Sequence, residues 1–161
     1  MPNDDNELEQ QITPAVRTLQ VIVAALCMGP IIFAAVVLIV IKPPAFEESD
    51  LMSRFAMLAG LGMVLAQSVV SGFVANQGVK EWAGSGGEVG ELSHVHQIRT
   101  IIACALCEAG AFFNLIVYGF LNADPWNLAM AGLLVAVTAT RFPAVAGVAD
   151  WCRNQARNAT F

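Results

Sequence analysis

The chain has 161 residues, of which 57% are hydrophobic and only 13% are charged, and its net charge is −5 at pH 7. A soluble domain carries about 25% charged residues, so this composition favours a membrane protein over a soluble one. The eight lysines and arginines form no basic patch, which leaves nucleic-acid binding without support. The apolar residues gather in four blocks, so we predict an all-α integral membrane protein with four transmembrane helices, arranged as a bundle of two hairpins.

The chain begins with a polar, acidic stretch, residues 1–18. This stretch lacks the basic start and the short apolar core of a secretory signal, so we expect a disordered or loosely helical lead-in that stays on the protein. The first predicted span covers residues 19–41 and is long enough to cross a bilayer with some tilt. Gly29 and Pro30 lie in its middle, where proline kinks a helix and the small Gly29 lets a neighbour approach closely.

The second predicted span covers residues 55–75. Side chains that recur at three- and four-residue steps share one face of a helix, and here that face is small and polar. Such a face suits close helix–helix contact in lipid, because Ala56 and Gly60 let the backbones approach. The residues of this face are Ala56, Gly60, Val64, Gln67 and Ser71.

The longest predicted loop, residues 76–98, contains a glycine-rich stretch at 84–90. Its glycine spacing does not match a phosphate-binding motif, so we interpret it as a flexible connector. His94 and His96 flank a single valine and lie near Glu91, which is too small a set to predict a metal site. We therefore expect a solvated loop that holds neither a metal nor another cofactor.

The third predicted span, residues 101–121, carries one residue that can be charged at neutral pH, Glu108. A carboxyl group at this depth costs about 2.5–3.5 kcal/mol on insertion scales, and a residue kept at such a cost is by default functional. Cys104 and Cys107 have the spacing of a redox or metal pair, but no base or further ligand accompanies them. We interpret them as small packing residues, which makes a thiol oxidoreductase the least supported hypothesis.

The fourth predicted span covers residues 125–142, with Asp124 as the helix cap before Pro125. Arg141 lies near the end of this span, where we expect its long side chain to snorkel outward. Residues 143–161 form a short tail that we expect to be a surface helix or a frayed end.

The transmembrane domain thus covers residues 19–142, and the basic residues predict its orientation. Six of them fall on the side of the termini and two on the other side, which places both termini and the loop 76–98 in the cytoplasm. This arrangement is typical of a multi-pass protein of a bacterial inner membrane. The six are Arg17, Lys80, Arg99, Arg141, Arg153 and Arg157, and the two are Lys42 and Arg54.

Gln67 is the predicted partner of Glu108. Counted inward from the same side, both lie roughly 10–12 Å inside the apolar layer at about 1.5 Å per residue. The amide of Gln67 can donate to a carboxylate or accept from a protonated acid, and Ser68 and Ser71 are alternative partners. Glu108 then either binds H⁺ or Na⁺, or stays protonated and only joins neighbouring helices.

Two short segments resemble the proteolipid (c or K) subunits of rotary ATPases. Residues 60–62, GLG, are similar to part of the glycine repeat of that family, and residues 105–117, ALCEAGAFFNLIV, are similar to its carboxylate segment. The resemblance covers residues 55–121 and implies a ring-forming subunit in which Glu108 carries H⁺ or Na⁺. Sodium-binding members add a glutamine on the first helix of the hairpin, which Gln67 matches.

A structural role is the competing interpretation. The chain would then be a non-catalytic protein of the lipid bilayer that assembles with itself or within a larger membrane complex, while Glu108 only hydrogen-bonds neighbouring helices. Small residues would let its helices approach closely. These packing residues are Ala56, Gly60, Gly29 and Gly110. Neither interpretation gives the chain a catalytic set of its own, so at most it is an ion-translocating subunit.

Overall fold

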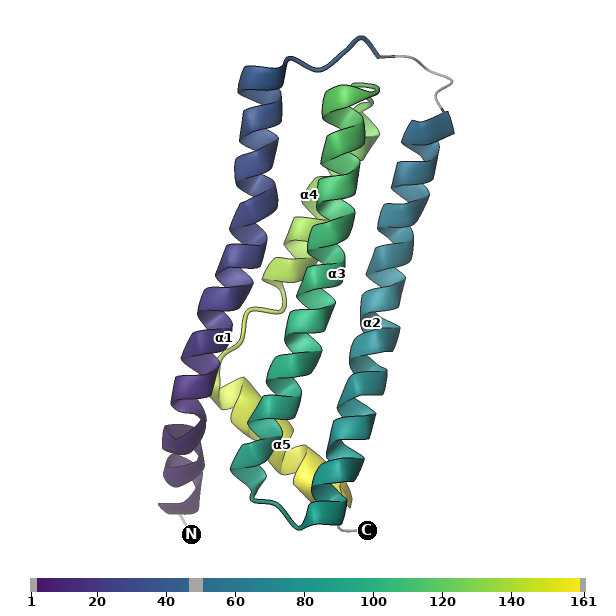
Figure 1. Ribbon diagram of the computed structural model, residues 1–161. Helices are drawn as coiled ribbons and strands as arrows, with labels where there is room; N and C mark the ends of the chain where they lie inside the picture. Colours follow the sequence, from purple (N-terminus) through teal and green to yellow (C-terminus); the bar gives the residue numbers. More distant parts are fainter. Residues whose placement is uncertain (1–2, 47–50, 160–161) are drawn as a thin grey trace.

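The computed structural model describes residues 3–46 and 51–159, and every regular element in these ranges is helical, which confirms the all-α part of the predicted fold class. Three long helices stand side by side, a shorter one packs against them, and the last crosses one end of the bundle (Figure 1). The elements are α1 (Asn3–Val36), the π-helical turn η1 (Val37–Ile41), α2 (Leu51–Ser85), the 3₁₀ turn η2 (Val89–Glu91), α3 (Leu92–Phe120), α4 (Pro125–Ala139) and α5 (Val145–Ala159).

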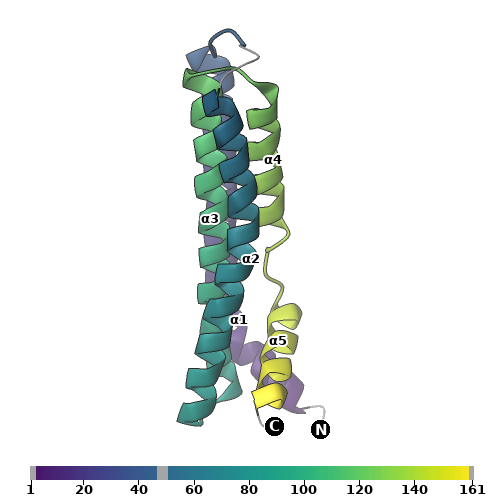
Figure 2. The ribbon, with the colours of Figure 1, turned by 90° about the vertical axis from the view of Figure 1, so that its right-hand side faces the viewer.

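Helix α3 is the centre of the bundle, since it contacts α1, α2 and α4. Helices α2 and α3 form a hairpin, and Gly86 in the turn between them has a φ of +66°, a conformation that glycine adopts without strain. Both ends of the described chain lie at the same end of the bundle, beside α5 (Figures 1 and 2). We call this end the base and define it as residues 3–18, 76–97 and 145–159.

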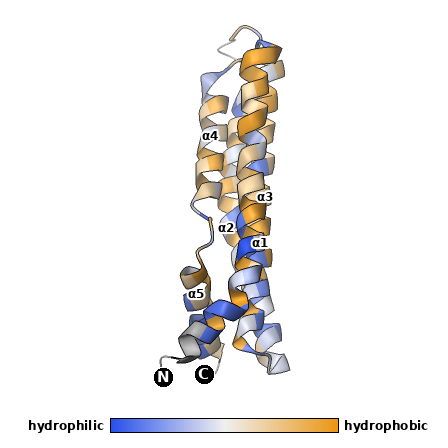
Figure 3. Ribbon diagram, turned by 90° about the vertical axis from the view of Figure 1, so that its left-hand side faces the viewer, coloured by the Kyte–Doolittle hydropathy of each residue, from blue (hydrophilic) through white to orange (hydrophobic). Residues whose placement is uncertain are grey.

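Many exposed large apolar residues lie on the bundle above the base, and we call this surface the apolar belt. The ribbon is mostly coloured hydrophobic over this part of the bundle (Figure 3). Its outermost exposed large residues are Val21 and Val40 along α1 and η1, and Ile98 and Leu121 along α3 and its C-cap. At about 1.5 Å per residue these stretches are about 29 and 35 Å long, close to the roughly 30 Å apolar core of a bilayer. The belt therefore has the height of a membrane.

The base is largely helical, including most of residues 76–98, for which the sequence pattern predicted a loop. Helix α1 begins at Asn3 and continues without a break into the belt, α2 continues to Ser85, and α3 begins at Leu92. The predicted loop over residues 76–98 is therefore wrong. The reason is a second apolar core that these segments share with α5, and each buried Val or Leu there contributes about 1.5–3 kcal/mol. This base core consists of Ile12, Val16, Leu92, Val148, Ala149 and Cys152.

Helix α4 is shorter than the predicted span 125–142. It begins as expected, because Asp124 Oδ1 accepts a hydrogen bond from the backbone N–H of Trp126 over 3.0 Å and Pro125 occupies the first turn. It ends at Ala139 after 15 residues, which is about 22 Å and less than the thickness of a bilayer core. Among the described residues, three helices rather than four are long and apolar enough to cross a membrane on their own.

Candidate functional site

Glu108 lies near the middle of the apolar belt. It is ten residues above Ile98, the lowest exposed large apolar residue of α3, which places its Cα about 15 Å inside the belt. Its side chain is half-buried. Its Oε1 atom is 3.0 Å from the position that a Cβ atom on Gly29 would occupy, so the carboxyl group occupies the space that Gly29 leaves open. Glu108 therefore belongs to the contact between α1 and α3.

The surroundings of Glu108 on α1 and α3 are apolar. Phe112, one turn further along α3, packs on Phe33 of α1 with ring centroids 5.4 Å apart. The charge of Glu108 also acts on the thiols of Cys27 and Cys104. Within the described part of the chain, Glu108 has no hydrogen bond and no ion pair. The carboxyl group therefore lies beside Gly29 and the ring of Phe112, with no hydrogen-bonded side chain among the described residues to hold it.

The predicted contact between Gln67 and Glu108 is wrong. Gln67 is 4% exposed, and its Oε1 accepts a hydrogen bond from Arg141 Nη2 over 2.7 Å. Its Nε2 donates to Ser68 Oγ over 2.9 Å, and Ser71 Oγ donates to the backbone carbonyl of Ser68 over 3.3 Å. The three polar residues of α2 thus form a group of their own, which binds the chain just after α4.

The prediction placed Gln67 and Glu108 at similar heights along the bundle, which agrees with the structure, but it assigned Glu108 to the wrong face of α3. Gly60 meets Asn114, and Gly78 meets Val95, so the hairpin does bring Gln67 close to the level of Glu108. Asn114 and Val95, however, lie on the side of α3 that meets α2. Glu108 lies on the side that meets α1, together with Phe112 one turn away. Equal depth therefore does not make the two residues neighbours.

The small residues lie where helices approach one another. A Cβ atom on Gly60 would be 2.6 Å from Met130 Cγ, and one on Gly110 would be 3.2 Å from Leu134 Cδ1. Ala56 is fully buried on the same face of α2 as Gly60. These residues hold α2, α3 and α4 together, whereas Gly29 lies in the separate contact of α1 with Glu108.

The sequence pattern missed two sets of contacts: those of Arg141, and those of a polar cluster at the end of the bundle opposite the base. Arg141 does not snorkel outward but is half-buried, because α4 ends at Ala139, before the belt does. At the other end, Ser53 Oγ donates to Asp124 Oδ2 over 2.5 Å and accepts from Asn127 Nδ2 over 2.7 Å. The helix-capping pattern at Asp124 was visible in the sequence, but its partner on α2 was not.

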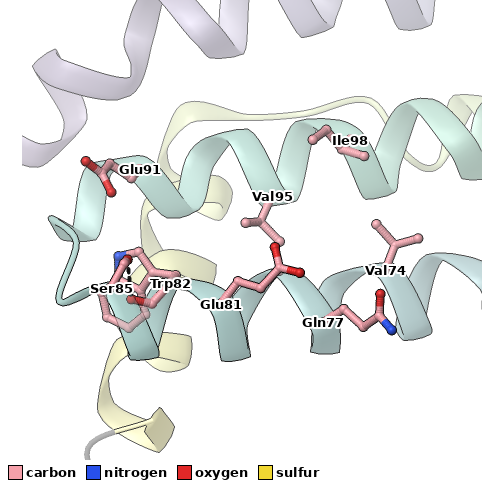
Figure 4. A pocket seen from close by; sticks show the side chains of 9 residues that line it. Val74, Gln77, Glu81, Trp82, Ser85, Glu91, Val95 and Ile98 are labelled. Atoms are coloured by element: carbon pink, nitrogen blue, oxygen red, sulfur yellow. Dashed lines mark hydrogen bonds between the residues drawn. The ribbon is translucent and has the colours of Figure 1, made fainter.

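A groove of about 490 Å³ opens between α2 and α3 in the base (Figure 4). Trp82 and Val95 line it together with the carboxylates of Glu81 and Glu91, and Trp82 Nε1 donates to the backbone carbonyl of Glu88 over 2.9 Å. Across residues 3–46 and 51–159, no three His, Cys, Asp or Glu side chains gather as a metal site would require. The groove is open and offers no reactive group.

The fold and the belt define a class: a helical protein with three helices long and apolar enough to span a membrane. The comparisons with known proteins add no family to that class. No family model matches the chain, and no curated protein and no solved structure gives a significant match. The case for a function therefore rests on the chain's own residues.

Proposed function

We propose that this protein is a multi-pass membrane protein in which Glu108 binds and releases a proton at the contact of α1 with α3. The observation that carries the proposal is the position of the carboxyl group, near mid-belt and 3.0 Å from where a Cβ of Gly29 would be. An intramembrane carboxyl group is costly and typically marks a proton or ion pathway. Glu108 has no fixed cation beside it among the described residues, so a proton is the simplest group that neutralises it.

The backbone of α1 supplies an acceptor for the protonated acid. Pro30 has no N–H, so the carbonyl of Leu26, four residues earlier, loses its helical hydrogen bond. Leu26 adjoins Cys27, on which the charge of Glu108 acts, and is one turn before Gly29. A neutral glutamic acid has one O–H donor, and the freed carbonyl is the acceptor that we assign to it.

Sodium fits this position less well than a proton. A bound Na⁺ needs several oxygen ligands at once, and the oxygens of Gln67, Ser68 and Ser71 bond to one another or to Arg141 on a different side of the bundle. Beside Glu108 lies the ring of Phe112, which offers no oxygen ligand. We therefore propose H⁺ as the ion.

Release of the proton requires the contact to open. An ionised carboxylate among apolar neighbours is unfavourable, so deprotonation favours a state in which water reaches Glu108. Helices kink at proline, and the pair Gly29 and Pro30 lies directly opposite the acid. We propose that α1 bends at this pair and alternately covers and uncovers the carboxyl group.

We further propose four membrane crossings, with α4 and residues 140–142 forming the fourth. The two described ends of the chain lie together at the base, as an even number of crossings requires (Figure 1). The base side carries six of the eight basic residues, so it is assigned to the cytoplasm of a cell whose inner membrane holds the protein.

The resemblance to rotary-ATPase proteolipids stays a prediction, as do a ring and a larger complex. The hairpin of α2 and α3 with an acid near mid-belt supports it. The sodium-binding version loses its support because Gln67 binds Arg141 instead of facing Glu108. The competing role, a protonated Glu108 that only joins α1 to α3, predicts the same contacts but no proton exchange.

Carbodiimide labelling of purified protein in vesicles tests the proposal. Dicyclohexylcarbodiimide reacts with protonated carboxyl groups in apolar surroundings, so we expect modification at Glu108, loss of labelling as pH rises, and no labelling of Glu108→Gln. Glu81→Gln, in the exposed groove of the base, is the matched control and should label like the unchanged chain. Passive proton uptake into the vesicles should fall in Glu108→Gln and after labelling.

Two outcomes would contradict the proposal. Labelling that does not depend on pH would show that Glu108 never releases its proton. Equal proton uptake by Glu108→Gln, Glu81→Gln and the unchanged protein would leave the acid with a structural role only.

A further inference from the structure

Two arginines on the base side of the apolar belt have no carboxylate partner among the described residues. Arg141 follows α4, and Arg99 lies near the base end of α3; both are half-buried. The positive charge of Arg141 reaches Arg99, and both charges reach His96. Within the described residues, neither guanidinium group has an ion-pair partner. The cluster is therefore a concentration of positive charge that the chain itself does not neutralise.

The chain holds both guanidinium groups in place with neutral contacts. Gln67 Oε1 accepts from Arg141 over 2.7 Å, and the guanidinium carbon of Arg99 lies 5.1 Å from the centroid of a Trp151 ring. The ring of His96 packs edge-on against the same tryptophan, with centroids 5.1 Å apart. Its Nδ1 atom is buried and has no hydrogen-bond partner among the described groups. Arg99 and His96 thus lie against Trp151, while Arg141 is held by Gln67, and none of the three has a carboxylate partner among the described residues.

We propose that Arg99 and Arg141 bind the phosphate group of an anionic phospholipid in the membrane leaflet on the side of the base. Guanidinium groups match phosphate oxygens with paired N–H donors, and basic pockets between membrane helices bind lipid head groups. A phosphate between the two groups replaces their mutual repulsion with two attractive contacts. The inference does not depend on Glu108.

The neighbouring residues indicate a lipid rather than a free phosphate compound. Ile98 precedes Arg99 and is 52% exposed, and Phe142 follows Arg141 and is 54% exposed. Each arginine therefore adjoins a large exposed apolar side chain, and Ile98 marks the lower edge of the belt on α3. A phospholipid whose phosphate is bound here has its acyl chains beside the apolar belt. A water-soluble phosphate compound would instead be placed against exposed apolar side chains, which is unfavourable.

Fluorescence of Trp151 in nanodiscs tests the site. Trp82→Phe and Trp126→Phe leave Trp151 as the only tryptophan, and phospholipids brominated near the head group quench it on contact. We expect brominated phosphatidylglycerol to quench more than brominated phosphatidylcholine at the same mole fraction. Arg99→Gln or Arg141→Gln should each weaken this preference about fivefold, which corresponds to about 1 kcal/mol per cation near a membrane. Arg54→Gln, exposed at the opposite end of the bundle, should leave the preference unchanged.

Native mass spectrometry of the unchanged protein gives a second readout that needs no tryptophan substitution. Preferential retention of phosphatidylglycerol over phosphatidylcholine would support the proposal. Equal quenching and equal retention of the two lipids would overturn it, as would a preference that both arginine variants keep. Competition with inorganic phosphate distinguishes the two sources of phosphate. If inorganic phosphate changes Trp151 emission and displaces phosphatidylglycerol, the site binds free phosphate and the lipid assignment is wrong.

Discussion

The packing of Gly60 allows a quantitative test of the bundle. A Cβ atom on Gly60 would lie 2.6 Å from Met130 Cγ and 2.8 Å from Asn114 Nδ2. Met130 is flexible and can shift. Asn114 is fully buried and donates from the same nitrogen to the backbone carbonyl of Gly110 over 2.9 Å. Gly60→Ala therefore strains a hydrogen bond that has no room to move.

The expected magnitude follows from three opposing effects. Overpacking a tight contact costs about 1–3 kcal/mol, and a weakened buried hydrogen bond adds about 0.5–1.5 kcal/mol. Replacing glycine by alanine within a helix returns up to about 1 kcal/mol. We expect Gly60→Ala to lower the free energy of unfolding by about 1–2 kcal/mol. Gly62→Ala, two residues away with no described atom within 4 Å of its added Cβ, should raise it by up to about 1 kcal/mol.

Reversible unfolding in mixed micelles, with increasing dodecyl sulfate and detection by circular dichroism, measures both variants against the unchanged chain. The two substitutions make the same chemical change in the same helix, so effects on helix propensity and detergent binding largely cancel. If Gly60→Ala were as stable as Gly62→Ala, α2 would not approach α3 as closely as the structure places it, and the reasoning would fail.

Three further outcomes are expected. Ser53→Ala leaves Asp124 Oδ2 without its hydroxyl donor and should lower the free energy of unfolding by about 1–3 kcal/mol, while Ser85→Ala on the exposed end of α2 stays near zero in the same unfolding assay. Leu92→Ala should cost about 2–5 kcal/mol, measured as earlier melting of the base by hydrogen exchange. Burial raises the pKa of the Cys152 thiol to about 11, so its thiolate fraction is small below that pH. Maleimide modification at pH 8, followed by mass spectrometry, should be slow in the folded chain and fast after unfolding.

The belt could be predicted from the sequence because it depends on hydropathy and segment length alone. The predicted spans 19–41, 55–75 and 101–121 coincide with α1 and η1, with α2, and with α3 up to Phe120. The base could not be predicted in the same way. Its helical segments are polar on average, and the residues that pack there, such as Ile12 and Leu92, come from segments far apart in the chain. A local pattern does not show which polar helix has a partner.

Glu108 was identifiable because a single acid in an apolar segment is conspicuous at any depth. The residue that contacts Glu108 could not be identified, because the rotation of α3 about its axis decides whether Glu108 faces α1 or α2. Gly29 was singled out as a packing residue, yet only the structure shows that the missing Cβ makes room for the carboxyl group. Depth counting fixes a residue along the helix axis and leaves the rotation open, which is why Gln67 was assigned to the wrong contact.

Glu108 and Arg141 are both half-buried charged residues of the belt, and neither neutralises the other. Glu108 lies at the contact of α3 with α1, whereas the guanidinium group of Arg141 bonds to Gln67 on α2. The two charged groups form no ion pair in the described structure. A purely structural pair of charges would be expected to neutralise each other, since an ion pair lowers the cost of both.

Because Glu108 and Arg141 stay apart, each needs neutralisation from outside the chain. We propose a proton for the carboxyl group and a lipid phosphate for the guanidinium group. The two roles separate by experiment: Glu108→Gln should abolish carbodiimide labelling and leave the phosphatidylglycerol preference of Trp151 quenching unchanged. A shared loss of both signals in that one variant would mean that the two charges do pair in the membrane, and the assignment of two independent sites would be wrong.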